Sequence, residues 1–93
     1  MNQNIAIGII VYQPQDSVLE RIKDTIDSGY KVYLFDNSPD ISIIRDYVYQ
    51  ESTDHSMVTY ITSGKNVGLG FGISVLCAHA YYDSFSTMLF FDQ

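Results

Sequence analysis

The sequence predicts an α/β fold, a three-layer α/β/α arrangement with a mostly parallel four-stranded sheet in the strand order 3-2-1-4. Apolar runs rich in β-branched and aromatic residues alternate with segments whose apolar residues recur at helical spacing. The runs are continuously apolar, as in strands that helices cover on both faces. The connections are short, and right-handed crossovers then restrict the topology to a Rossmann-like sheet that reverses between the first and fourth strands.

The first strand and helix have clear sequence signals. Residues 5–12 (IAIGIIVY) form a continuous apolar run, and Pro14 ends it because proline cannot donate to a central ladder. Ser17 and Glu20 have the spacing of a capping box, which predicts the start of a helix. Gly29 is a natural residue to end that helix, because glycine accepts a left-handed backbone.

The same alternation continues to the last residue of the chain. Apolar runs predict a second strand at 31–35, a third at 57–61 and a fourth at 87–91. Helical spacing predicts a second helix over 40–50 and a third over 69–80. We therefore expect the whole chain, 1–93, to form a single domain.

Composition excludes several classes of function. The formal net charge is −6 and the five basic residues form no run, so we expect no nucleic-acid partner. The apolar runs are too short for a membrane span, and the first residues show no signal-peptide pattern. The single cysteine, Cys77, fits a reducing compartment, so we expect a cytoplasmic protein. Its helical position predicts a buried, structural thiol.

The carboxyl ends of the predicted strands carry the candidate functional residues. Ligands bind outside these ends in open parallel sheets. Asp36 follows the second strand, and its carboxylate either contacts a nucleotide base or ribose or forms an Asx turn that caps the next helix. Asp92 follows the fourth strand, and it is either part of a divalent-metal site that bridges phosphates or an ordinary polar exit.

The glycine-rich segment 68–72 does not match the dinucleotide fingerprint, because Ile73 stands where the third glycine is needed. Two interpretations remain open for these glycines. They allow the backbone to approach a ligand, or they allow a helix to pack closely on the sheet. Lys65, just before this segment, is a candidate phosphate ligand or a solvated lysine.

Read together, four segments resemble family 2 glycosyltransferases, and among them the bacterial rhamnosyltransferase-like group. The segments are 11–14 (VYQP), 36–38 (DNS), 66–70 (NVGLG) and 91–93 (FDQ), the last being the start of a DxD motif. The resemblance covers nearly the whole chain in the right order. It implies the N-terminal, nucleotide-binding half of a GT-A fold, truncated at the DxD motif.

The resemblance also implies a set of site residues and ligands. The nucleotide-binding residues would be Ile10, Val11, Tyr12, Asp36, Asn66, Gly68 and Asp92. Asp92 would face the ribose and a divalent cation, Mg²⁺ or Mn²⁺, while the second acid of the motif would be residue 94. The expected donor is a UDP- or dTDP-linked sugar, and the expected pathway is cell-surface polysaccharide synthesis.

No residue of the chain is a candidate for the catalytic base that the family uses, so we expect no catalytic residue here and an inactive isolated chain. The alternative is a non-catalytic α/β module that binds a nucleotide or a partner protein. A receiver-type regulator is less favoured, because 13–15 (QPQ) lacks an acidic pair. We also expect that surfaces left uncovered by truncation favour homo-oligomers.

Overall fold

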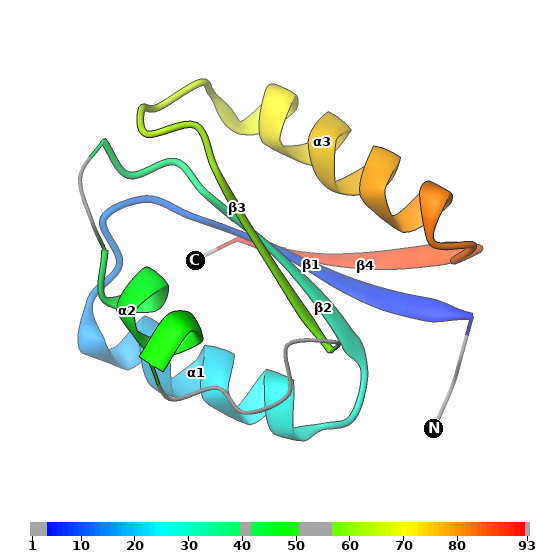
Figure 1. Cartoon of the computed structure of the whole chain (residues 1–93), viewed down its shortest axis with the longest axis horizontal. Helices are drawn as coiled ribbons and strands as arrows, with labels where there is room; N and C mark the ends of the chain where they lie inside the picture. Colours follow the sequence, from blue (N-terminus) through cyan, green and yellow to red (C-terminus); the bar gives the residue numbers. More distant parts are fainter. Residues whose placement is uncertain (1–3, 40–41, 51–56, 93) are drawn as a thin grey trace.

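The computed structural model describes residues 4–39, 42–50 and 57–92, with the side chains of Gln50 and Asp92 outside the description. Strands and helices alternate through the described chain, as Figure 1 shows. In order they are β1 (Ile5–Val11), α1 (Asp16–Asp27), β2 (Lys31–Asp36), α2 (Ile43–Gln50), β3 (Val58–Thr62), α3 (Leu69–Tyr82) and β4 (Thr87–Asp92).

The four strands form one sheet in the order β3-β2-β1-β4, and all neighbours are parallel. β1 lies between β2 and β4: Ile10 is level with Phe35 on one side and with Asp92 on the other. The predicted fold class and strand order are confirmed. From β1 the chain adds β2 and β3 on one side and then β4 on the other, so the order of strand addition reverses between β1 and β4. A parallel sheet of this kind opens a crevice at such a point.

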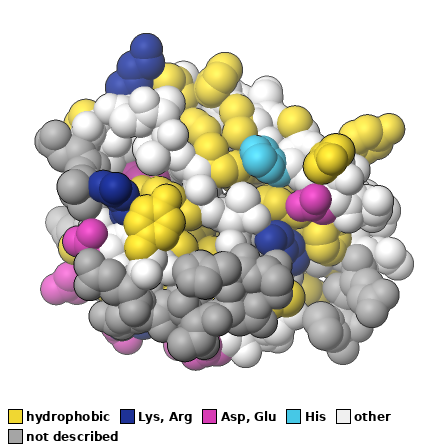
Figure 2. Space-filling model, in the orientation of Figure 1, with side chains coloured by type: hydrophobic (Ala, Val, Ile, Leu, Met, Phe, Trp, Pro, Cys, Tyr) yellow, Lys and Arg dark blue, Asp and Glu magenta, His cyan; other side chains and the backbone are white. Residues whose placement is uncertain are grey.

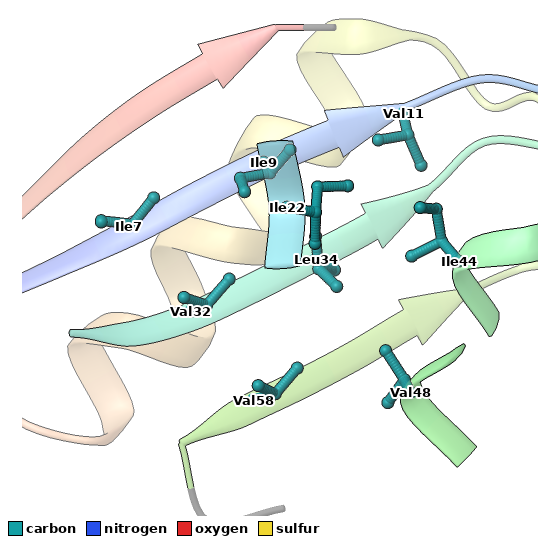
Figure 3. Packing of buried hydrophobic residues seen from close by; sticks show 9 residues of the cluster. All are labelled: Ile7, Ile9, Val11, Ile22, Val32, Leu34, Ile44, Val48 and Val58. Atoms are coloured by element: carbon teal, nitrogen blue, oxygen red, sulfur yellow. The ribbon is translucent and has the colours of Figure 1, made fainter. Parts of the chain in front are cut away.

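Helices cover both faces of the sheet. α1 and α2 lie on one face and α3 on the other, as the ribbon in Figure 1 shows. Alternate residues of β1 lie on opposite faces: Ile7 and Ile9 belong to the same core cluster as Ile22 of α1, and Figure 3 shows Ile9 beside Ile22. Ala6 and Ile10 pack instead with Leu76 of α3. Burial on both faces explains the continuous apolar runs that predicted these strands.

Two glycines permit close approach. A Cβ on Gly72 would lie 3.0 Å from the Phe35 ring, so this glycine lets α3 pack tightly on β2. A Cβ on Gly8 would lie 2.7 Å from Sδ of Met88 and 3.0 Å from the Phe90 ring. The packing interpretation of the glycine-rich segment therefore holds for Gly72.

Two local predictions are wrong. Ser17 and Glu20 do not form a capping box: the N-cap of α1 is Gln15, whose carbonyl already accepts the first helical hydrogen bonds. Helical backbone thus begins before Ser17. Cys77 is exposed rather than buried. The buried residues of α3 are Gly72, Leu76 and Ala80, four positions apart, and Cys77 lies one position after Leu76, off this buried face.

The helix ends agree better with expectation. Gly29 has a φ of 89° just after α1, as predicted for a residue that ends a helix. α3 is apolar on all sides, and hydrophobic side chains remain at the surface along it in Figure 2. No helix in the described residues is long and apolar enough to cross a membrane.

Candidate functional site

A small cavity of about 260 Å³ opens at the carboxyl end of β1. It lies between the turn after β1, the turn after β2 and the start of α3. The lining residues are Ile10, Val11, Tyr12, Asn37, Asn66, Gly68 and Leu69. Five of the seven residues predicted to bind nucleotide are thus brought together, although they come from segments far apart in the sequence.

The turn after β1 places Tyr12 at the cavity. Val11 is buried at the end of the strand, whereas Tyr12 is 45% exposed. The next residue, Gln13, has a φ of 42°, which is unusual for a residue with a side chain. Its amide donates to Oγ of Ser38 at 2.7 Å, which ties the turn after β1 to the turn after β2. Tyr12 therefore presents a half-exposed ring from an anchored turn.

Asn37 lines the cavity, although the sequence analysis did not predict it as a binding residue. It is buried, and its amide donates to the carbonyl of Val11 at 2.8 Å. Its side-chain oxygen accepts from the amide of Val67 at 3.1 Å, and its Nδ2 donates to the carbonyl of Gly68 at 3.4 Å. Asn37 thereby fixes the segment before α3 against the ends of β1 and β2. Its place directly after a buried strand was the available signal.

Gly68 shapes the start of α3. Its φ of 90° and ψ of 159° belong to a region that essentially only glycine adopts. Its amide donates to Oδ1 of Asn66 at 2.9 Å, while α3 has no side-chain hydrogen bond at its N-cap. The first amides of a helix lack intrahelical acceptors and carry partial positive charge. The α3 N-terminus next to the cavity is thus suited to face an anionic group.

Asp36 is buried beside the cavity and is not among the residues that line it. Its carboxylate accepts hydrogen bonds from the amide of Ser38 at 2.9 Å, from the hydroxyl of Ser42 and from the hydroxyl of Tyr60 at 2.6 Å. Burial, and next the hydrogen bond to Asp36, raise the pKa of Tyr60 above its ordinary value. The bond to Ser38 confirms the Asx turn. It does not cap the next helix as predicted, because α2 begins only at Ile43 and the amide of Arg45 donates to Oγ of Ser42. Contact of Asp36 with a nucleotide stays a prediction.

Asp92 reaches the same edge of the sheet through its backbone, which is level with Ile10 in the β1–β4 pair. Its side chain lies outside the described part of the chain, so its metal role stays a prediction. Among the described residues, no three His, Cys, Asp or Glu side chains lie together in a way that could hold a metal ion. The carboxylate of Asp36 is already committed to protein donors. The described side chains therefore do not fit a divalent cation by themselves.

Comparison of the chain with protein-family models, with curated proteins and with solved structures finds no match. Membership of the glycosyltransferase family thus stays a prediction from the four sequence segments. The fold and the cavity at its carboxyl edge are the structural basis for any function proposed for the chain.

Proposed function

We propose that this chain is the nucleoside-diphosphate-sugar-binding part of a glycosyltransferase similar to the rhamnosyltransferase-like members of family 2. The observation that carries the proposal is the cavity at the β1 carboxyl end. It lies at the carboxyl edge of the sheet, where open parallel sheets bind ligands, and Tyr12, Asn66 and Gly68 line it as the resemblance implies.

The size and lining of the cavity suit one part of such a donor. Its volume of about 260 Å³ is just below the range of roughly 300–1,000 Å³ for whole small-molecule sites. That space suits a base with its ribose and leaves the diphosphate and sugar outside. The half-exposed ring of Tyr12 offers a face on which a base can stack, an interaction of about 1–3 kcal/mol per base in other proteins.

The diphosphate would lie toward the N-terminus of α3. The chain has a net charge of −6, so a bound anion needs local compensation. The free amides of the first turn, which begins at Leu69, supply part of it. In the complete enzyme, a cation held by residues beyond those described would supply the rest of the charge neutralisation.

The proposal assigns binding, and not catalysis, to these residues. Inverting sugar transfer needs a base that deprotonates the acceptor hydroxyl, and the described residues that line the cavity include no candidate for it. We therefore expect the isolated chain to transfer no sugar. A cytoplasmic location, where nucleotide sugars are to be found, and a role in cell-surface polysaccharide synthesis belong to the same proposal.

One observation favours a second function, the non-catalytic α/β module, and within it a module that binds a partner protein and not a nucleotide. The carboxylate of Asp36, which the resemblance assigns to the base, is 1% exposed and accepts three hydrogen bonds from the protein itself. A carboxylate that already accepts these hydrogen bonds can bind a nucleotide base only if it loses one of them, so the net gain in binding free energy is small.

Titration calorimetry with UDP and dTDP, each with and without Mn²⁺, separates the two functions. The proposal expects saturable binding of at least one nucleotide, weakened about tenfold in Tyr12→Ala through loss of the stacking face. Tyr81→Ala is the matched control, because Tyr81 is also exposed but lies in the last turn of α3, at the opposite end of that helix from the cavity. Absence of binding under all four conditions would favour the non-catalytic module. Equal weakening by both variants would contradict the assignment of Tyr12 as the stacking face of the site.

A further inference from the structure

β4 is an edge strand whose hydrogen-bonding groups face outward on one side. In the described part of the chain it has a neighbouring strand, β1, on one side only. The amide of Thr87 donates inward to the carbonyl of Asn4 at 3.1 Å. Because backbone groups alternate in direction along a strand, Met88, Phe90 and Asp92 direct their amides and carbonyls away from β1. Such a row is a template for another strand.

Both faces of β4 also expose large apolar side chains. Leu89 and Phe91 are 50% and 51% exposed, and they share a face with their β1 partners Ile7 and Ile9. Phe90 is 40% exposed on the opposite face, over Gly8. An edge strand that has one face in water usually carries polar side chains on that face. In β4, Met88 packs against the core on the α3 face, whereas Phe90 on that face and Leu89 and Phe91 on the other are exposed apolar side chains. The strand thus has the character of an interior strand.

An apolar groove of about 340 Å³ runs between α1 and β4. Its floor includes Ile9, Ile22 and Phe91, and its rim carries two opposite charges, Arg21 and Asp24. These two residues are three positions apart on α1, so they lie on the same side of the helix. The groove therefore combines an apolar floor with a pair of charges that an antiparallel copy of the same helix would complement.

We propose that β4 pairs antiparallel with β4 of a second copy of this chain, which would continue the sheet to eight strands about a two-fold axis. With the axis at Phe90, this residue pairs with itself, and Leu89 of each copy lies opposite Phe91 of the other. Each of the three exposed apolar side chains then contacts a cross-strand neighbour and loses part of its exposure, and the outward backbone groups of Met88, Phe90 and Asp92 pair. A two-fold interface of this type uses the same surface on both copies.

Charge complementarity favours this occupant. β1 and its counterpart in the second copy would be three strand spacings apart, about 14 Å at roughly 4.8 Å each. Each α1 packs over β1 and β2 of its own copy, and Arg21 and Asp24 lie on the side of the helix that lines the groove with Phe91. The two α1 helices would then run antiparallel on either side of the axis, with these sides turned toward each other. Ile22 and Phe91 share the groove, so the axis passes near the level of Arg21 and Asp24. Arg21 of each copy would face Asp24 of the other, above the apolar floor.

The first test is the molar mass of the chain in solution by light scattering and sedimentation equilibrium. The proposal expects a dimer, and Leu89→Lys should raise its dissociation constant at least about tenfold, because it buries a charge opposite Phe91. Tyr49→Lys, a similar change at an exposed aromatic on α2, should leave the constant unchanged. A monomeric chain, a dimer unaffected by Leu89→Lys, or a dimer weakened equally by Tyr49→Lys would overturn the proposal.

The second test fixes the register and does not depend on how Leu89→Lys folds. In a Cys77→Ser background, Phe90→Cys should form an intermolecular disulfide, because a self-paired residue in a hydrogen-bonded antiparallel pair has a Cα separation of about 5.5 Å. Leu89→Cys should cross-link much less, since its counterpart lies two positions away. Charge reversal adds a check: Arg21→Glu should weaken the dimer, and Arg21→Glu with Asp24→Arg should restore it. Equal cross-linking at both positions, or no rescue, would overturn the proposed register.

Discussion

At the scale of single residues, the carboxylate of Asp36 has three hydrogen-bond partners, of which the sequence predicted one and missed the other two. The sequence predicted its place at a strand end and its ability to form an Asx turn. It did not predict the other two partners, Ser42 and Tyr60, which are 6 and 24 residues away along the chain. Those contacts depend on how α2 and β3 pack, so no local pattern contains them. The carboxylate joins three segments beneath the candidate site.

This arrangement makes the charge of Asp36 structurally important. Asp36→Asn replaces one acceptor oxygen by a donor group, so the hydroxyls of Ser42 and Tyr60 lose their common acceptor. We expect the free energy of unfolding to fall by about 1–3 kcal/mol. Urea denaturation of the variant checks it, with Asp46→Asn on the exposed side of α2 as the control. Equal stability of Asp36→Asn and the unmodified chain would show that the three bonds contribute little.

Two tyrosines predict a loss of stability in alkali. Burial, and next the hydrogen bond to Asp83 or Asp36, raise the pKa values of Tyr33 and Tyr60 in the folded chain. Their contribution to the free energy of unfolding is therefore complete below the ordinary tyrosine pKa of about 10. It is lost as the pH rises above that value, because these two hydroxyls then ionise in the unfolded chain but not in the folded one. We expect the free energy of unfolding to decline from pH 10 upward, and less steeply in Tyr33→Phe and Tyr60→Phe. Unchanged steepness in both variants would contradict the assignment.

At the scale of elements, the sequence predicted every strand and helix of the described chain to within a few residues at each end. The strongest signals were the apolar runs, because strands buried on both faces tolerate few polar residues. Helix starts were harder to place. The Ser17 and Glu20 pattern was local and plausible, yet the turn after Pro14 already brought Gln15 into position as the N-cap of α1. Backbone geometry set by the preceding turn outweighed a side-chain pattern.

The start of α3 gives a matched pair of glycine variants. Gly68→Ala forces a side chain into a φ of 90°, and we expect it to cost about 1–3 kcal/mol of stability although no atom lies within 4 Å of the new Cβ. Gly70→Ala lies in the helix, also in open space, and should stabilise the chain by about 0.5–1 kcal/mol. Thermal and urea unfolding distinguish them. A neutral Gly68→Ala would show that the segment 66–68 adopts another backbone without penalty.

At the scale of the whole molecule, one part of the candidate site was predictable from the sequence and another was not. The strand order was predictable, because short right-handed crossovers leave few alternatives, and it placed Tyr12, Asn66 and Gly68 at one edge. The role of Asn37 was not, since it arises from three hydrogen bonds to residues of two other segments. Strand order brings segments to the same edge, whereas side-chain packing decides which of their polar groups are left for a ligand.

The strand order also predicts how the chain folds. The central strand β1 is formed by the first residues of the chain and pairs with β4, formed by the last: Ile5 is level with Thr87. Parallel pairing over such separations requires closure of long loops before contacts form, so we expect refolding in milliseconds to seconds and not in microseconds. Stopped-flow fluorescence of the tyrosines measures it, and a complete refolding phase within the dead time would contradict it.

During synthesis, the same topology keeps one edge of β1 without its partner until Thr87–Asp92 has left the ribosome. Through that interval an apolar strand can pair with β2 on one side only, and its other edge is open to unrelated chains. We therefore expect the incomplete chain to aggregate more readily than the complete one. Codons that slow translation before Thr87 would lengthen this vulnerable period.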